Sequence, residues 1–239
     1  MSTNSSIDKM CLSYWFPKLF AAGLPVPTTH LLSMPPEAFR DVFRVFDGEQ
    51  TVGDLEAFAA KVKDAADRLG YPCFLRTGQT SGKHDWENTC YISDPESIAQ
   101  HIINIVEFSE CVQLVGLDCS VWAVREFLPT KPLGVCPRYG NMPLCREIRF
   151  FVADGEVKCW HPYWPLKALE QGGADLALYD ELAATTYDGY AAAVSLAHKA
   201  ARAIEGAWSV DVLETERGWY VTDMAEAEKS YHEEGCKEQ

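Results

Sequence analysis

Three stretches of the chain carry the helical repeat of apolar positions. In residues 54–69 the apolar side chains recur every three or four positions, and Gly70 marks the end of the predicted helix. Residues 95–110 and residues 188–205 show the same period. We therefore predict three amphipathic helices, spread over most of the chain.

Between these helices lie short runs rich in β-branched and aromatic residues. Single strands are predicted at residues 71–76, 90–92 and 121–128. Residues 147–160 contain two such runs around Asp154-Gly155, and residues 208–224 contain two around Arg217-Gly218, so each pair predicts a β-hairpin. Because hairpins outnumber β-α-β units, the predicted fold class is α+β with mostly antiparallel sheets.

The two ends of the chain have weaker patterns. Residues 1 to about 50 predict irregular structure, with Trp15-Phe16-Pro17 and Leu24-Pro25-Val26-Pro27 as stiff extended pieces. The last dozen residues are charged and are expected to be loose. The chain has 239 residues and no boundary that would let either half fold alone, so we predict one unit with two lobes, about 1–125 and 126–239.

Composition narrows the possible functions. A hydrophobic content of 47% is enough for a sizeable core, which argues against global disorder. The net charge of −14 argues against nucleic-acid binding and against docking to anionic membranes. No apolar run reaches the roughly 18 residues of a spanning helix, and the N-terminal residues lack the pattern of a signal peptide. Nine cysteines without a C-x-x-C pair then indicate reduced thiols in a cytoplasmic protein.

The first candidate for chemistry is the segment RTGQTSGKHDW, which starts at Arg76. A strand delivers Arg76, and a loop rich in Gly, Ser and Thr then leads to Lys83. Backbone amides of such a loop can approach phosphate oxygens, and the lysine adds a positive charge. A P-loop is excluded, because only three residues separate Gly78 from Gly82 and His84 replaces the hydroxyl residue. Phosphate contact and a solvated surface lysine stay open as alternatives.

Two aspartates of the second predicted hairpin form the next candidate. Asp211 and Asp223 lie near the inner ends of its strands, and residues opposite each other on paired strands come within ~5 Å. Two carboxylates that close repel each other unless a cation lies between them. Mg²⁺ is the natural cation, because it prefers oxygen ligands and keeps several waters. The alternative is one partly exposed aspartate at each strand end.

Two further segments are ambiguous by themselves. Glu147 and Arg149 share a strand face, where they form either a surface ion pair or a site in which Arg149 clamps a phosphate. The strand that ends in Glu126 and Phe127 either supplies backbone hydrogen bonds to an adenine edge or is an ordinary core strand.

Histidine and cysteine spacing gives weak support to a zinc site. Cys159-x-His161 and His232-x-x-x-Cys236 each resemble half of a site, but no second pair has matching spacing. The sequence therefore does not favour zinc over ordinary core and surface residues.

Taken together, these segments resemble the ATP-grasp fold. An arginine-bearing strand, a loop and a lysine are followed by REF at 125–127, EIRFFVADGEV at 147–157, and VDV and YVTDM within 210–224. Their order is most similar to the cell division cycle protein 123 family, and the segment DMAEAEKSYHEEGC is also similar to small ATP-grasp proteins of bacteria and phages. The resemblance covers roughly residues 71–226 and implies two lobes that enclose a nucleotide.

The resemblance implies an ATP site and gives roles to particular residues. Arg76 and Lys83 match phosphate-contacting basic residues, and Arg149 matches a second arginine of this kind. Glu126 and Phe127 lie where the segment that joins the lobes meets adenine and ribose.

The same resemblance implies a Mg²⁺ site with one departure. Asp211 and Asp223 match the metal-binding acids, but the family's Asp-x-Asn motif reads Asp-Met-Ala here, and Ala225 cannot coordinate a metal. We expect that Glu226 or Glu228 replaces the missing ligand, that one Mg²⁺ is held differently, or that catalysis is weakened.

The resemblance leads to one main functional hypothesis. ATP-grasp relatives transfer the γ-phosphoryl group of ATP to a carboxylate, and an amine or thiol then attacks the acyl phosphate. We therefore expect an ATP- and Mg²⁺-dependent ligase acting on a peptide or protein, in which Lys83, Arg76 and Arg149 stabilise the developing charge. Substrate residues are expected in the loops at 129–145 and 161–185.

Two alternatives remain open. The first is an ATP-binding assembly factor without ligase turnover, since the cell division cycle protein 123 relatives are implicated in assembling translation initiation factor 2. The second is a kinase that stops at phosphoryl transfer.

Overall fold

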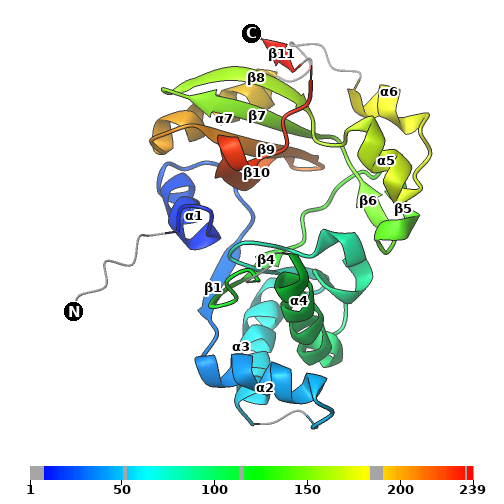
Figure 1. The fold of residues 1–239 in the computed structure, drawn as a ribbon. Helices are drawn as coiled ribbons and strands as arrows, with labels where there is room; N and C mark the ends of the chain where they lie inside the picture. The colour runs from blue at the N-terminus through cyan, green and yellow to red at the C-terminus, as the bar shows by residue number, and fades with distance from the viewer. Residues whose placement is uncertain (1–7, 51–52, 113–115, 184–190, 235, 239) are drawn as a thin grey trace. The chain divides into compact units, whose positions relative to one another are not determined.

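The chain forms two compact units in the computed structural model, which describes residues 8–50, 53–112, 116–183, 191–234 and 236–238 (Figure 1). Unit 1 contains the N-terminal residues up to Val26, residues 129–134, and the residues from Leu144 onward. Unit 2 contains Pro27–Leu128 and Val135–Pro143. The N-terminal residues therefore belong to the same unit as the C-terminal half of the chain.

Unit 2 is built around a four-stranded antiparallel sheet with the strand order β1-β4-β2-β3. Its strands are β1 (Thr29–Ser33), β2 (Cys73–Thr77), β3 (Tyr91–Ile92) and β4 (Val121–Glu126). Its helices are α2 (Pro36–Phe46), α3 (Gly53–Leu69) and α4 (Ile98–Val112), with 3₁₀ turns η1 (Lys83–Asn88), η2 (Pro95–Ser97) and η3 (Pro137–Tyr139). The predicted helices at 54–69 and 95–110 and the three predicted single strands are confirmed to within a few residues.

One face of this sheet is apolar and packs against α3 and α4. Trp122 on β4 contacts Phe58 on α3 with ring centroids 5.7 Å apart, and Leu75 on β2 belongs to the same buried cluster. Because successive side chains on a strand point to opposite faces, Arg76 and Arg125 lie on the face away from this core. Burial of the apolar face thus decides which side chains the other face presents.

Unit 1 is built around a five-stranded antiparallel sheet with the strand order β10-β9-β7-β8-β11. Its strands are β7 (Glu147–Ala153), β8 (Glu156–Pro162), β9 (Trp208–Thr215), β10 (Gly218–Glu226) and β11 (Lys237–Glu238). Its helices are α1 (Leu12–Ala21), α5 (Leu166–Gly172), α6 (Leu178–Ala183) and α7 (Ala191–Ala203), with the 3₁₀ turn η5 (Ala227–Lys229). A small sheet of β5 (Gly134–Cys136) and β6 (Met142–Leu144) lies in the segment before β7.

Both predicted hairpins are confirmed. β7 and β8 are joined through Asp154 and Gly155, whose φ angles of 56° and 78° are those of a two-residue turn that matches the strand twist. β9 and β10 form the second hairpin. The helix predicted at 188–205 is confirmed as α7, although residues 188–190 lie outside the described residues. Within the described part of the chain, no helix is both long enough and apolar enough to cross a membrane.

The prediction of an irregular N-terminal region was wrong. Residues 12–46 form α1, β1 and α2, and the Trp15-Phe16-Pro17 segment is helical rather than extended. Leu12, Trp15, Phe16 and Leu19 recur at helical spacing and are buried. Burial of this apolar stripe outweighs the backbone hydrogen bond that Pro17 cannot make inside the helix.

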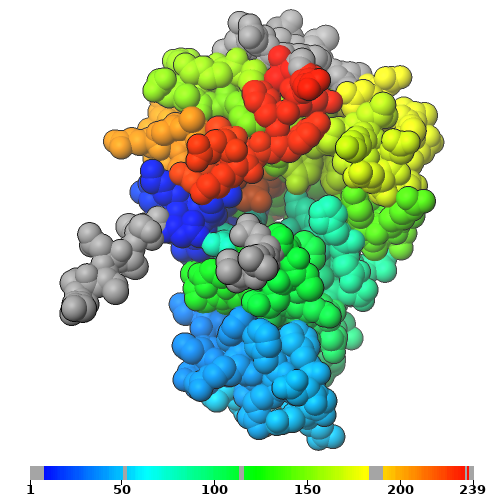
Figure 2. Space-filling view, in the orientation of Figure 1, coloured from blue at the N-terminus to red at the C-terminus, as the bar shows by residue number. Residues whose placement is uncertain are grey.

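The expectation of a loose C-terminal segment needs a similar correction. Lys237 and Glu238 pair with Trp160 and Cys159 of β8, so the segment adds a strand to the sheet. Figure 2 shows this segment, drawn in red, on the surface of unit 1 beside the yellow-green strand β8.

A buried carboxylate joins α2 to α3. Oδ2 of Asp41 accepts hydrogen bonds from the backbone N–H groups of Asp54 at 3.1 Å and Leu55 at 3.2 Å. The first amides of a helix have no carbonyl partner within the helix, so Asp41 caps α3 from a neighbouring helix. Arg44 adds an ion pair to the same carboxylate at 3.3 Å.

We predict that Asp41→Ala lowers the free energy of unfolding by about 1–2 kcal/mol, because two buried amides lose their acceptor. Urea denaturation followed by circular dichroism measures this change. Glu37→Ala is the control, since Glu37 lies exposed on the same helix and is expected to change stability by less than about 0.5 kcal/mol. Equal stability of the two variants would contradict the capping role.

Candidate functional site

The five-stranded sheet of unit 1 has one polar face, and the strand register determines its members. Arg149 on β7 lies between His161 on β8 and Asp211 on β9, and Asp223 on β10 lies opposite Asp211. Glu147 precedes Arg149 by two residues and shares its face. The opposite face packs against α7 through buried apolar residues, among them Ile148, Phe150, Val210 and Val212.

Arg149 and Asp211, both predicted site residues, bind each other. Nε of Arg149 donates to Oδ1 of Asp211 at 2.7 Å, and Nη2 donates to Oδ2 at 2.8 Å. Asp211 is only 3% exposed, and the Arg149 side chain is 17% exposed. The guanidinium also lies 4.9 Å from the centroid of the Tyr163 ring. These contacts fix the direction of the cation on the polar face.

Electrostatics keep this arginine charged. Burial alone would lower the pKa of Arg149, but the negative charge and the hydrogen bonds of Asp211 outweigh burial and raise that pKa. Arg149 is therefore a permanent cation whose charge is balanced locally by one carboxylate.

The predicted pairing of Asp211 with Asp223 is confirmed by the strand register, and a third acid lies beside them. A β-bulge at Thr222 precedes Asp223. Oγ1 of Thr222 donates to Oε1 of Glu147 at 3.0 Å and to the carbonyl of Asp211 at 3.3 Å. Glu147 is buried, and it was absent from the predicted metal ligands. Its period-two spacing from Arg149 was the signal that identifies it.

Glu226 is placed differently from the two aspartates. The register runs without a shift from Asp223 to Glu226, so their odd separation puts the two side chains on opposite faces of β10. The Glu226 carboxylate pairs with Lys229 at 2.8 Å. The structure therefore does not bring Glu226 to the aspartate pair, and Glu147 is the carboxylate that shares their face.

The acidic residues of the polar face fit Mg²⁺. Asp211, Asp223 and Glu147 offer oxygen ligands, although their carboxylates do not gather within 4.8 Å of one another as a group of three. Mg²⁺ commonly takes one or two carboxylates and completes its shell with waters and phosphate oxygens. An aspartate pair with a third acid nearby matches that requirement.

The polar face of the unit 2 sheet carries buried arginines. Arg76 on β2 lies diagonally across from Arg125 on β4, and both are buried. Nε of Arg76 donates to the carbonyl of Thr77 at 3.1 Å, and Nε of Arg125 donates to Oγ1 of Thr29 at 3.2 Å. Arg125 was not predicted as a site residue, because its segment also fits a core strand. An anion on this face would offset the repulsion between the two cations.

Lys83 begins the 3₁₀ turn η1, within the stretch that the sequence predicted as a polar loop. Gly82 before it has a φ of 64°, and a Cβ atom there would approach Thr89 to 3.2 Å, so the turn requires glycine. Burial raises the pKa of the nearby Cys90 thiol to about 12, while the charges of Lys83 and Arg76 oppose that rise. Both cations therefore act on the same buried thiol.

Phe127 belongs to an aromatic cluster in unit 2. Its ring centroid lies 5.3 Å from that of Tyr91 and 6.1 Å from that of Trp86, and Trp86 and Tyr91 stack at 5.6 Å. The N–H of Glu126 donates to the carbonyl of Thr28 at 2.9 Å, so this amide is already used within the sheet. The segment thus offers aromatic surface to a flat base, more than the backbone amide expected from the sequence.

Comparison with family models identifies one match. A family described as an ATP-grasp domain, the third family of its clade, matches residues 67–233. This range contains every candidate residue of the two polar faces. No curated protein matches the chain.

Several solved structures are similar to the chain at low identity. Cdc123 from Schizosaccharomyces pombe is 13% identical, with 91% of this chain and 83% of that chain covered and a TM-score of 0.55. An ADP complex of purK, an N5-carboxyaminoimidazole ribonucleotide synthetase, is 13% identical, with 90% and 44% covered and a TM-score of 0.50. A RimK domain protein ATP-grasp from Sphaerobacter thermophilus is 15% identical, with 91% and 59% covered and a TM-score of 0.46.

These similarities concern the fold. The chain spans less than two thirds of the synthetase and of the RimK domain protein. The match to Cdc123 agrees with an α+β architecture of mostly antiparallel sheets, as the sequence predicted.

We predict that Arg149→Met lowers the free energy of unfolding by roughly 3–5 kcal/mol, because Asp211 is left buried without its cation. Adding Asp211→Asn to this variant should recover part of the loss, since the buried negative charge is then removed. Urea denaturation measures both effects.

Arg146→Met is the matched control for this experiment. Arg146 pairs with Glu214 at 2.7 Å, but their side chains are 32% and 41% exposed, so a cost below about 1 kcal/mol is expected. If Arg149→Met costs no more than this control, the Arg149–Asp211 pair does not hold the sheet as described.

Proposed function

The chain belongs to the ATP-grasp domains, in the third family of the matched clade, and from this premise we propose that it binds ATP with Mg²⁺ and uses them to activate a carboxylate. The Arg149–Asp211 pair carries the proposal, with Asp223 opposite and Glu147 alongside. A fixed cation next to oxygen ligands supplies the two things that phosphoryl transfer requires, namely positioning and charge neutralisation.

Basic residues bind the phosphates in this proposal. Arg76 and Lys83 contact phosphate oxygens, and the buried Arg125 adds a third positive charge on the same sheet face as Arg76. Arg149 lies ready to stabilise the negative charge that develops on the transferred group. Because Asp211 fixes the Arg149 guanidinium, this cation needs little reorganisation when ligand binds.

Asp211 and Asp223 hold Mg²⁺, and Glu147 is the further carboxylate on their face. When bound, Mg²⁺ supplies charge neutralisation and orients the phosphate oxygens. Asp211 can serve without releasing Arg149, since a carboxylate offers about four lone-pair sites and Arg149 uses only some of them. Glu226 stays as the alternative third ligand.

The aromatic cluster of Trp86, Tyr91 and Phe127 binds adenine. Aromatic faces stack on any purine, and one such contact contributes about 1–3 kcal/mol in nucleic-acid sites. The Glu126 carboxylate, next to Phe127 in the chain, is suited to accept hydrogen bonds from ribose hydroxyls.

The proposed reaction has two steps. A carboxylate oxygen of the substrate attacks the γ-phosphorus of ATP, the bond to the β-phosphate oxygen breaks, and ADP leaves. An amine or thiol then attacks the acyl carbon, loses its proton, and displaces inorganic phosphate. A peptide or protein with basic residues suits the net charge of −14 as the substrate.

One observation favours a second function. Ala225 lies on the same face as Asp223, opposite Ser209, so a methyl group stands where an Asn ligand was expected. A weakened metal site suits an ATP-binding assembly factor without turnover, and the similarity to Cdc123 fits this reading. A kinase that stops after phosphoryl transfer is the third candidate.

We predict Mg²⁺-dependent ATP binding in titration calorimetry, weakened about 10- to 100-fold by Lys83→Ala, because one charged hydrogen bond to phosphate is lost. Lys63→Ala is the control, since Lys63 lies exposed on α3 and pairs with Asp67. Absence of binding at millimolar ATP, or equal weakening by both substitutions, would overturn the nucleotide site.

Turnover separates the three candidate functions. With a peptide pool and hydroxylamine as the trap, we predict ADP release and a hydroxamate product, both abolished by Asp223→Asn and Glu147→Gln and retained in Glu226→Gln. If the Glu226 substitution is the damaging one, the ligand set from the sequence is correct instead.

Other outcomes identify the alternatives. ATP binding without ADP release, together with a stoichiometric protein partner in affinity purification, supports the assembly factor. A phosphorylated product that resists hydroxylamine supports the kinase.

A further inference from the structure

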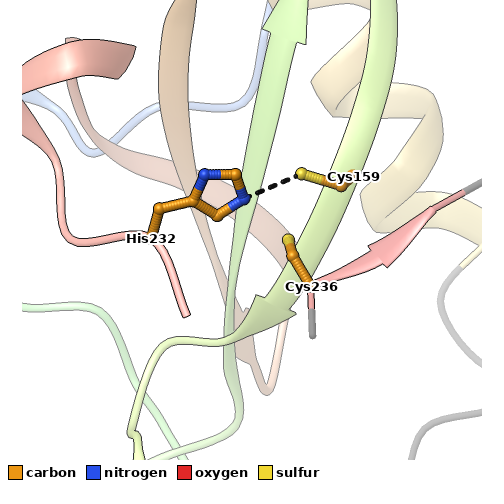
Figure 3. Close-up of side chains that lie close together, drawn as sticks. All are labelled: Cys159, His232 and Cys236. Atoms are coloured by element: carbon orange, nitrogen blue, oxygen red, sulfur yellow. Dashed lines mark hydrogen bonds between the residues drawn. The ribbon is translucent and has the colours of Figure 1, made fainter. Parts of the chain in front are cut away.

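Three side chains in unit 1 bring together segments that are far apart in the sequence. Cys159 lies on β8, whereas His232 and Cys236 lie in the segment that leads to β11. Their ligand atoms all lie within 4.8 Å of one another, and Figure 3 shows the three side chains pointing toward a common centre. We propose that Cys159, His232 and Cys236 bind a zinc ion.

The distances are close to those of a zinc site. Sγ of Cys159 and Nε2 of His232 are 3.1 Å apart. Zinc binds sulfur at about 2.3 Å and imidazole nitrogen at about 2.0 Å, so these two ligands lie roughly 3.5 Å apart in a tetrahedral site. A small outward shift of the exposed His232 therefore suffices to admit the ion.

The surrounding structure orients these ligands. The His232 ring stacks on Phe151 of β7, with centroids 4.0 Å apart and the planes 25° from parallel. The pairing of Glu238 with Cys159 holds the chain next to Cys236 against β8. Cys159 is buried, Cys236 is half-buried and His232 is exposed, so the cluster is anchored on the sheet and open to solvent on one side.

A second observation points to the same ligand. His161 is 2% exposed and lies two residues after Cys159, on the same face of β8. Its Nδ1 lies 2.7 Å from the carbonyl of Pro162, so Nδ1 carries the proton and Nε2 has a lone pair. Among the described residues nothing accepts or donates a hydrogen bond at this Nε2, and the ring lies 6.3 Å from that of His232.

A buried nitrogen with an unused lone pair is costly, and a metal ion explains it. The His161 Nε2 would either complete the coordination shell or accept a hydrogen bond from a water on the ion. In both cases it adds a donor to the three residues of the cluster.

Charge also favours a cation. Burial and the neighbouring Cys159 thiol raise the pKa of Cys236, since two adjacent thiolates would repel each other. Zinc binds sulfur as thiolate, releases the protons and removes that repulsion. All nine cysteines are free thiols, so both sulfurs of the cluster are available.

The site is distinct from the acidic ligands of the polar face. Sulfur and imidazole ligands select zinc, whereas the carboxylates of Asp211 and Asp223 suit Mg²⁺. A zinc ion here would bind the C-terminal segment to β8, and this role does not depend on ATP or on the proposed ligase reaction.

Metal titration tests the proposal. Reduced protein is stripped with a chelator, titrated with Zn²⁺ against a chromophoric competitor, and analysed for bound metal after gel filtration. We expect about one zinc per chain, and affinity weakened on the order of 100-fold in each of Cys159→Ser, His232→Gln and Cys236→Ser. Cys111→Ser is the control, because Cys111 is an exposed thiol on α4 and should leave the affinity unchanged.

Cobalt provides a readout that a merely structural effect would not move. Co²⁺ in the wild-type protein should show tetrahedral d–d bands and a thiolate-to-metal charge-transfer band. That band should weaken in each cysteine variant and persist in His232→Gln. Circular dichroism verifies that every variant is folded.

Three results would overturn the zinc site. They are substoichiometric zinc in the reduced wild type, equal zinc affinity in Cys159→Ser/Cys236→Ser, and a Cys159–Cys236 disulfide in the isolated protein. Lys83→Ala should bind zinc normally, so failure of the nucleotide site and failure of the zinc site are separate outcomes.

Discussion

The strand register of the five-stranded sheet is the constraint on which the candidate site depends. One face of the sheet must be apolar because it packs against α7, so the alternate residues on β7, β9 and β10 are forced onto the other face. Arg149, Asp211 and Asp223 come together there because they share one row of the sheet. A slip of one residue in any of these strands would bury the charges and expose the core. Folding of the core and assembly of the site are therefore one process.

Local signals in the sequence predicted much of this arrangement. The Asp-Gly turn predicted the first hairpin, and the spacing of the second predicted that Asp211 would face Asp223. The helix α1 was missed because Pro17 and its neighbours suggested an extended segment, whereas the buried stripe around it decides the conformation. Where local preference and burial disagree, burial of large side chains wins.

Relations between distant segments could not be predicted in the same way. The Arg149–Asp211 pair depends on β7 lying next to β9, which no local pattern specifies. Glu226 was chosen for its closeness in sequence to Asp223, although an odd separation on a strand puts it on the other face. The cluster of Cys159, His232 and Cys236 takes one ligand from one half-site and two from the other, because β11 returns to β8. The net charge likewise gave no sign of the buried Arg76 and Arg125.

The shortest strand of the sheet has a consequence of its own. β11 consists of Lys237 and Glu238, and it covers part of the outer edge of β8. An uncovered edge presents a row of backbone donors and acceptors that can recruit a strand from another molecule. A charged strand of two residues is enough to interrupt that row. Removal of Lys237 and Glu238 would thus turn this side of the sheet into a template for intermolecular β-pairing, so these residues help to keep the molecule from self-association.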